Sequence, residues 1–171
     1  AAIAARHGFL SMVDDAHALG VIGKTGRGSS EHFGAAARKP DVTIGTLSKA
    51  VGCEGGFACG SRVVVDYLRN KARSFIFSTA PSPAVVGAAL RAVEKMRDEP
   101  ARVEALRRNI DVFVEALSRH GIPAATQTAI VPIRIGESAA ALRVAERLLA
   151  RGYYVPAIRH PSVPQGTARL R

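Results

Sequence analysis

Two segments of the chain combine residue types that could hold and activate an organic cofactor. In the first, an apolar stretch ends at Asp14 and Asp15, and His17 follows three positions after Asp14. An acidic residue at the carboxyl end of a strand lies where α/β folds bind their ligands. It can keep a pyridine nitrogen protonated, so that the ring accepts electrons, while the histidine reaches the same ring from the next loop. A turn that carries two solvated aspartates is the alternative.

The second segment, residues 43–50, contains Lys49 close to the hydroxyls of Thr46 and Ser48 and to several glycines. Hydroxyl groups can bind a phosphate, and glycines let the backbone approach a ligand closely. A lysine amine forms a Schiff base once burial or a nearby cation lowers its pKa. Most single lysines lie on the surface, but Asp14 stands 35 positions earlier, at the end of the preceding strand. The pair meets two requirements of pyridoxal phosphate (PLP), a lysine for the aldehyde and a carboxylate for the ring nitrogen.

A third segment, residues 159–171, is rich in arginine and proline. Arginine binds carboxylates through two parallel hydrogen bonds, and a proline-rich loop could hold such arginines rigidly as one wall of a substrate pocket. A structural loop that carries surface arginines is the alternative.

The first two segments need a layer of strands to bring them together. Short apolar runs predict four strands, at residues 9–13, 42–44, 57–59 and 75–77. Residues 1–7 are expected to end a helix that stops at Gly8, and Ser61 is expected to cap a helix that extends to about Lys71. Strands that alternate with helices and glycine-rich loops indicate an α/β layer with a largely parallel sheet.

After residue 80 the pattern changes to long amphipathic helices. Ser82 followed by Pro83 predicts a helix start, and apolar residues at helical spacing continue to Gly121, with a break expected near Pro100. The segment that follows predicts a strand at residues 130–135, a helix capped by Ser138 and ending near Gly152, and a strand at residues 153–158.

The element order predicts two domains. We expect residues 1–100 to form the C-terminal part of a large cofactor-binding α/β domain, and residues 101–171 to form an incomplete small α+β domain. The first residues resemble the middle of a helix, and the last ones stop without a closing element. We therefore expect the chain to be a fragment of a longer protein.

Composition excludes several classes of function. The 171 residues are 47% hydrophobic and carry a net charge of +10, but the arginines are scattered among glutamates and only 5% of residues are aromatic, so no nucleic-acid partner is expected. No apolar run approaches the roughly 20 residues that cross a membrane, and a cytoplasmic location is expected. Cys53 and Cys59 fit neither a disulfide framework nor a zinc pattern, so we expect two small buried residues and no metal.

Taken together, these segments resemble the α-oxoamine synthases, which are fold-type I PLP-dependent enzymes of the aspartate aminotransferase superfamily. The resemblance extends over essentially the whole chain in order, which makes it more specific than any single motif. The matching segments are residues 14–17, 20–23, 26–28, 45–50, 55–57, 75–79, 157–159 and 166–171. The fold class that this implies is a partial large α/β domain followed by a small C-terminal domain.

The resemblance implies a role at the cofactor for each of four residues. Lys49 would hold PLP as a Schiff base and carry the proton at the substrate Cα. Asp14 would pair with the pyridinium nitrogen, His17 would hydrogen-bond the oxygen of the ring 3-hydroxyl, and Thr46 would contact the phosphate.

It also implies a shared active site and a substrate site. Ser78 and Thr79 resemble a segment that reaches the phosphate bound by the neighbouring subunit, so a homodimer is expected. Arg171 matches the arginine that holds the amino-acid carboxylate, and Arg159 belongs to the same substrate loop. Ser162 stands where the family usually has a threonine that contacts the substrate.

Within the family, the chain is most similar to the members that act in biotin synthesis. The reaction implied is a decarboxylative condensation of L-alanine with pimeloyl-CoA, or with its acyl-carrier-protein equivalent, which releases CoA and CO2. His160 departs from this group, which usually has proline at that position of the substrate loop. Because the family places part of its acyl-binding pocket outside the matched segments, we expect the 171-residue chain alone to be inactive.

Other readings remain open at this point. Glycine C-acetyltransferase (2-amino-3-ketobutyrate ligase) is the second choice, followed by the 5-aminolevulinate and serine palmitoyl synthases, all of which need both Lys49 and Asp14. Three features favour the biotin-pathway reaction: the Ile158–Arg159 loop, the ending at residues 166–169, and Asp15, where aminolevulinate synthases tend to carry Glu-Val. A non-catalytic partner subunit is a further alternative, which the presence of Lys49 disfavours.

Overall fold

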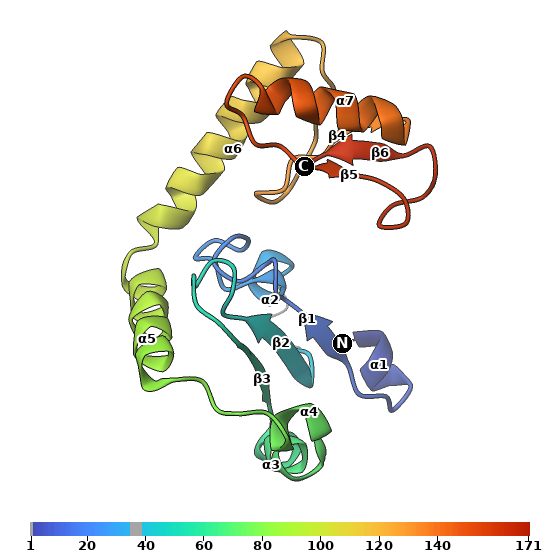
Figure 1. Cartoon of the computed structure of the whole chain (residues 1–171). Coiled ribbons are helices and arrows are strands. Elements are labelled where there is room, and N and C mark those ends of the chain that lie inside the picture. The colour runs from blue at the N-terminus through green and yellow to red at the C-terminus, as the bar shows by residue number, and fades with distance from the viewer. Residues whose placement is uncertain (1, 35–38) are drawn as a thin grey trace. The chain divides into compact units, whose positions relative to one another are not determined.

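The computed structural model describes residues 2–34 and 39–171. The chain divides into two compact units, Ala1–Leu106 and Arg107–Arg171, which are considered separately below. Figure 1 shows the order of the elements along the chain. Within the described residues, no helix combines the length and the apolar character needed to cross a membrane.

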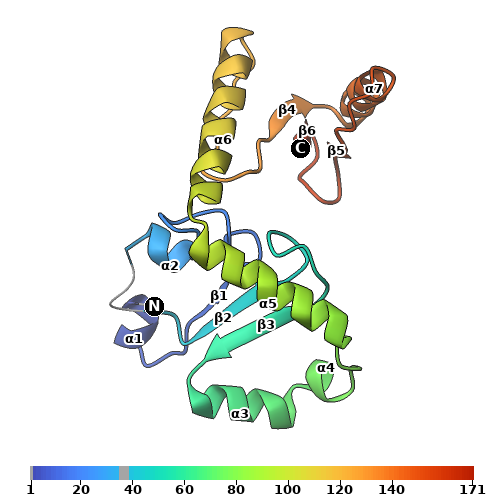
Figure 2. The same cartoon turned by 90° about the vertical axis from the view of Figure 1, so that its left-hand side faces the viewer.

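A three-stranded sheet with the order β1-β2-β3 forms the centre of the first unit. Strand β1 (Met12–Asp14) pairs in parallel with β2 (Val42–Thr46), and β2 pairs antiparallel with β3 (Gly56–Gly60). Figure 2 shows the three strands as neighbours, with α5 (Pro83–Asp98) on one side of the sheet. The expectation of a largely parallel sheet therefore holds for β1 and β2 and is wrong for β3. Residues 47–55 are too few for the crossover that a parallel partner requires, so the chain turns straight back.

Helices of the first unit begin where their capping residues predict. The hydroxyl of Ser61 accepts a hydrogen bond from the Val64 N–H at the start of α3 (Arg62–Lys71). The hydroxyl of Ser82 does the same for the Val85 N–H at the start of α5, where Pro83 is the first helical residue. Helix α1 (Ala2–Arg6) also agrees with expectation and is followed by Gly8 at φ +68°. Residue 1 of the predicted N-terminal helix lies outside the described residues.

The predicted strand at residues 75–77 is wrong, because this segment forms the short helix α4 (Arg73–Ile76). The N–H groups of Phe75 and Ile76 both donate to the Ala72 carbonyl at 3.0 Å. The aromatic and β-branched side chains suggested a strand, but a strand needs a neighbour to bond, and here the backbone bonds locally. A second short helix, α2 (Ser29–His32), lies within the predicted glycine-rich loop. Cys59 is exposed, against expectation, and Cys53 is partly buried.

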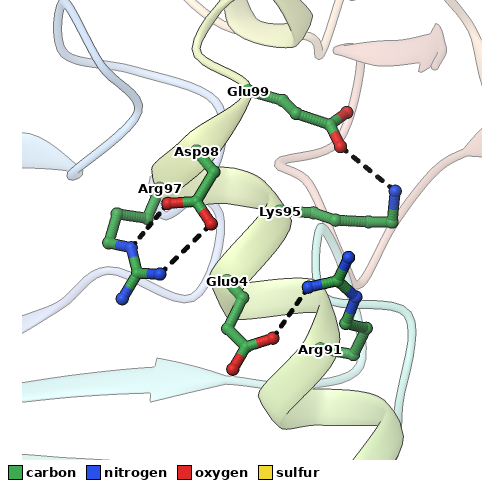
Figure 3. Close-up of polar contacts among 6 residues, drawn as sticks. All are labelled: Arg91, Glu94, Lys95, Arg97, Asp98 and Glu99. Carbon is green, nitrogen blue, oxygen red and sulfur yellow. Dashed lines mark hydrogen bonds and ion pairs between the residues drawn. The ribbon is translucent and has the colours of Figure 1, made fainter.

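Two long helices follow in sequence, α5 and α6 (Ala101–Arg119), with the predicted break at Glu99 and Pro100. Exposed ion pairs line this region (Figure 3), and they are Arg91–Glu94, Lys95–Glu99 and Arg97–Asp98. Glu99 also accepts from Arg102, in the first turn of α6. Hydrogen bonds from Lys95 and Arg102 lower the pKa of the Glu99 carboxyl group. Of these pairs, Glu99–Arg102 spans Pro100, and exposed pairs of this kind contribute little to stability.

The second unit contains an antiparallel sheet with the order β4-β6-β5. Its elements are β4 (Ile133–Gly136), α7 (Ser138–Leu149), β5 (Ala157–Ile158) and β6 (Ala168–Leu170). Ala141 of α7 is fully buried, as are Ala168 and Leu170 of the central strand. Both outer strands are shorter than predicted. Ser138 is the first helical residue rather than the cap, because Glu137 is the residue with extended backbone before the helix.

Candidate active site

The carboxyl ends of β1 and β2 bring the two predicted cofactor segments to one edge of the sheet. Asp14 is the last residue of β1 and lies opposite Ile44 of β2. Strand β2 ends at Thr46, and Lys49 follows three residues later. Because parallel strands end at the same edge, a carboxylate, two hydroxyls and an amine all emerge there.

Asp14 and His17 belong to one tight turn after β1. The Oδ1 atom of Asp14 accepts a hydrogen bond from the Ala16 N–H at 2.9 Å, which leaves Oδ2 available to a ligand. The N–H groups of Ala18 and Leu19 both donate to the Asp15 carbonyl, at 2.9 and 3.0 Å. Asp14 and His17 are exposed, so the turn presents both side chains to solvent.

Lys49 lies in a second turn, which is closed by two backbone hydrogen bonds. The Gly52 N–H donates to the Lys49 carbonyl at 3.0 Å, and the Cys53 N–H donates to the Leu47 carbonyl at 2.7 Å. Lys49 is exposed, and within the described part of the chain its amine has no hydrogen bond or ion pair. The backbone is therefore held while the amine stays available for reaction.

Two hydroxyls stand beside this turn. The Oγ1 atom of Thr46 lies 2.8 Å from the Oγ atom of Ser48 and donates to the Gly55 carbonyl at 3.2 Å. The Ser48 N–H in turn donates to Thr46 Oγ1 at 3.2 Å. A pair of neighbouring hydroxyls is a suitable set of donors for a phosphate group.

Glycines allow the two turns to pack closely. A Cβ atom placed on Gly20 would lie 2.7 Å from the Cβ of Ala50 and 2.9 Å from the Cε of Met96. Real Cβ contacts are not that short, so the loop after His17 approaches the residue after Lys49 only because residue 20 has no side chain. Gly45 has a similar role in β2, where the Phe57 ring of β3 occupies the space of a side chain.

Ser78 and Thr79 lie in the connection between α4 and α5, and both are exposed. The Ser78 hydroxyl donates to the Ser74 carbonyl. Nothing within the first unit ties this connection to the edge that carries Asp14 and Lys49 through a hydrogen bond among the described residues. Their predicted role at a neighbouring subunit stays a prediction.

The predicted substrate residues lie in the second unit and are all exposed. Ser162 follows Arg159 in a turn, where the Ser162 N–H donates to the Arg159 carbonyl at 3.0 Å. Arg171 lies at the far end of the β5–β6 pair, where its N–H donates to the Pro156 carbonyl at 3.3 Å. Ala157 pairs with Leu170, so the antiparallel register places Arg159 and Arg171 beyond opposite ends of the β5–β6 pair.

Sequence reasoning missed the part played by Asp15, which is only 6% exposed. Its carboxylate accepts hydrogen bonds from the hydroxyl and the N–H of Ser29, at the start of α2. One signal was available: successive side chains at a strand end point to opposite faces, so two consecutive aspartates are expected in different surroundings. Nothing in the sequence says which of the two turns inward.

The donor set at this edge fits PLP, because it includes an amine for an aldehyde, a carboxylate for a ring nitrogen and hydroxyls for a phosphate. Residues 1–171 match the family described as Aminotransferase class I and II. The chain belongs to this family. Aminotransferase class I and II members use PLP, and the predicted cofactor is confirmed at that level.

Two curated relatives show which enzymes of the family the chain is similar to. This aminotransferase-family chain is 47% identical over 161 residues to 8-amino-7-oxononanoate synthase 1 of Bacillus velezensis, covering 94% of the chain and 41% of the relative. It is 43% identical over 170 residues to 8-amino-7-oxononanoate synthase of Symbiobacterium thermophilum, covering 99% of the chain and 43% of the relative. The chain thus spans less than half the length of the curated relatives it matches.

A solved structure of SPT with a PLP internal aldimine superposes with a TM-score of 0.92 at 32% identity, over 99% of this chain and 43% of that one. The predicted fold class, a PLP-dependent transferase of fold type I, is confirmed. The resemblance to the α-oxoamine synthases is confirmed as well, since relatives of this chain include enzymes named 8-amino-7-oxononanoate synthase.

Proposed function

We propose that the full-length protein condenses L-alanine with pimeloyl-CoA, or with pimeloyl acyl carrier protein, to 8-amino-7-oxononanoate, CoA and CO2 in biotin biosynthesis. One observation carries the proposal: Asp14 and the Thr46–Lys49 segment emerge at the same edge of a parallel strand pair. The names of relatives that are 47% and 43% identical support this reaction over others of the family.

At that edge, Lys49 would hold the aldehyde carbon of the cofactor through its amine. Freed by the incoming amino acid, the same amine would take the proton from the substrate Cα and later return one. Lys49 has no competing polar partner among the described residues, which suits both tasks. When bound, PLP supplies a protonated ring that takes up the electron pair left at Cα.

The neighbouring side chains would hold the cofactor and tune its ring. The carboxylate of Asp14 would keep the ring nitrogen protonated through Oδ2, since Oδ1 already accepts from the Ala16 N–H. His17, in the same exposed turn, would donate to the ring 3-oxygen. The hydroxyl of Thr46, beside Ser48, would turn from the Gly55 carbonyl to donate to the phosphate.

The substrate and the assembly belong to the same proposal. Arg171 would bind the carboxylate of alanine, with Ser162 and Arg159 in the loop that borders the substrate. Ser78 and Thr79 would reach the phosphate of a second subunit, which makes the enzyme a homodimer in the cytoplasm. Residues 1–100 would then be part of the cofactor-binding domain and residues 101–171 part of the small domain.

Cofactor attachment is the first test. The full-length protein is incubated with PLP and reduced with borohydride, and its peptides are mapped by mass spectrometry. We expect one pyridoxyl group, on Lys49, and none in a Lys49→Ala control. A pyridoxyl group on another lysine, or none in the wild type, would overturn the proposed role of Lys49.

Substrate choice is the second test. Alanine and glycine are added separately to the PLP-loaded protein in the presence of pimeloyl-CoA, and release of free CoA is followed with a thiol reagent. We expect release with alanine. The same assay is run with glycine and acetyl-CoA, and release only in that pair would assign the protein to glycine C-acetyltransferase.

A further inference from the structure

Within the described residues, Asp15 is the one charged side chain buried from solvent, with 6% exposure. It stands between two exposed residues of the proposed site, Asp14 and, two positions later, His17. Burying a carboxylate is costly unless hydrogen bonds replace its water. The hydrogen bonds that replace the lost water of the Asp15 carboxylate therefore indicate its role.

Both carboxylate oxygens of Asp15 bind the same residue. Oδ1 accepts from the Ser29 hydroxyl at 2.5 Å, and Oδ2 accepts from the Ser29 N–H at 3.1 Å. The Asp15 N–H donates to the Ile44 carbonyl of β2 at 2.8 Å. Asp15 thus joins three parts of the unit: the end of β1, strand β2 and the start of α2. Hydrogen bonds to a charged group are among the strong ones, so this joint is held firmly.

The loop from residue 16 to residue 28 is closed by this contact. A Cβ atom on Gly28 would lie 2.2 Å from Asp15 Oδ2, so the backbone passes against the carboxylate where a side chain could not fit. Nearer the start of the same loop, Gly20 packs against Ala50, the residue after Lys49. Because the loop is held at both places, the positions of His17 and Lys49 relative to each other are constrained.

We infer that Asp15 is a positioning residue of the cofactor site, which holds Asp14 and His17 in place by fastening their loop to Ser29. The inference rests on the proposed function of that site. Because Asp15 is adjacent to Asp14 in the chain, a change in its backbone direction would turn the Asp14 carboxylate as well. Loss of the contact would therefore weaken cofactor binding.

A matched control exists at the opposite end of the same strand pair. The N–H and the hydroxyl of Ser11 both donate to Asp41 Oδ2 at 2.7 Å, which is the same serine–aspartate chemistry. Strand β1 begins one residue after Ser11, and β2 begins one residue after Asp41. Neither residue borders a member of the proposed site.

The test compares Asp15→Asn and Ser29→Ala with Asp41→Asn and Ser11→Ala in the full-length protein. The dissociation constant of PLP, the pH profile of the bound cofactor's absorbance and the thermal midpoint are measured for each. In Asp15→Asn the side chain keeps one acceptor oxygen and loses its charge, so the Ser29 N–H and hydroxyl no longer donate to two carboxylate oxygens. We expect PLP affinity to fall roughly tenfold or more and the pH profile to shift, as for loss of a charge-assisted hydrogen bond. In the control pair, both cofactor readouts should match the wild type.

Ser29→Thr keeps the hydroxyl and should restore the affinity lost in Ser29→Ala, which keeps the test decisive if Asp15→Asn does not fold. Wild-type affinity and pH profile in both Asp15→Asn and Ser29→Ala would overturn the inference while leaving the proposed function intact. An equal loss in Asp41→Asn would also overturn it, because the effect would then be general destabilisation. Failure of the wild type to form the borohydride adduct at Lys49 would instead overturn the proposed function.

Discussion

A serine–aspartate contact occurs at both ends of the β1–β2 pair, in different surroundings. At the amino ends, Ser11 donates its N–H and its hydroxyl to Asp41, and at the carboxyl ends Ser29 donates the same two groups to Asp15. Asp41 is exposed, whereas Asp15 is 6% exposed. The comparison teaches that burial and neighbours, rather than the residue types, decide what a serine–aspartate contact contributes.

The carboxyl ends carry the side chains of the proposed site. Asp14, His17 and Lys49 are exposed there on turns that a buried carboxylate and close glycine contacts support. The serine–aspartate contact at the amino ends is exposed and borders none of these side chains. If this contrast is correct, equivalent substitutions at the two ends should have unequal effects, and the following experiments measure the difference.

The largest difference should come from Lys49 itself. Lys49→Ala removes both the covalent attachment of the cofactor and the proton carrier, so the rate of CoA release should fall roughly 10³-fold or more. Lys39→Ala, near the amino end of β2, should leave the rate unchanged. A Lys49→Ala enzyme that kept even a tenth of the wild-type rate would remove the asymmetry between the two ends.

Glycine substitutions should come next. Gly28 and Gly8 both have positive φ, +88° and +68°, but a Cβ atom would strike Asp15 Oδ2 at Gly28 and meets nothing within 4 Å at Gly8. Gly8→Ala should lower the free energy of unfolding by ~1–2 kcal/mol, from backbone strain alone. Gly28→Ala should cost clearly more, because the Asp15–Ser29 contact must open. Denaturant titration measures both, and equal losses would show that the close approach at Gly28 is not a constraint.

A smaller effect is expected when the two aspartates are truncated. Asp15→Ala leaves the N–H and hydroxyl of Ser29 without acceptors in a buried place, which should cost ~1–3 kcal/mol of unfolding free energy. Asp41→Ala leaves the donors of Ser11 in contact with water, so its loss should be smaller. The same denaturant titration decides, and a larger loss at Asp41 would reverse the comparison.

The smallest effect concerns pH. Hydrogen bonds from the Ser11 N–H and hydroxyl lower the pKa of the Asp41 carboxyl group below its ordinary value of 3.8. A lowered pKa stabilises the fold above the unfolded value, and that stabilisation disappears as pH falls through the folded value. Asp41→Asn should therefore have a slightly lower thermal midpoint than the wild type at neutral pH and an equal one well below pH 3.8. A difference that grows on acidification would contradict the assigned cause.

Local signals predicted the helix starts well. Ser61 and Ser82 cap α3 and α5 as their residue types suggest, because a cap needs only the three or four residues that follow it. Predictions that depended on a distant partner were weaker. Residues 73–76 form a helix despite their strand-like side chains, and β3 runs antiparallel to β2. Strand pairing depends on what lies next to the strand in space, which the sequence of that strand does not contain.

In the candidate site, too, some features follow from the sequence and others depend on the tertiary structure. The residue types and their spacing predicted Lys49 and Asp14 as the cofactor residues, and the cofactor itself is confirmed, because the chemistry of PLP demands a lysine and a carboxylate wherever they occur. The sequence could not distinguish the tasks of the two consecutive aspartates. Folding turns Asp14 toward solvent and buries Asp15 against Ser29, since the partner that compensates a buried carboxylate stands 14 positions away and meets it only when the loop closes.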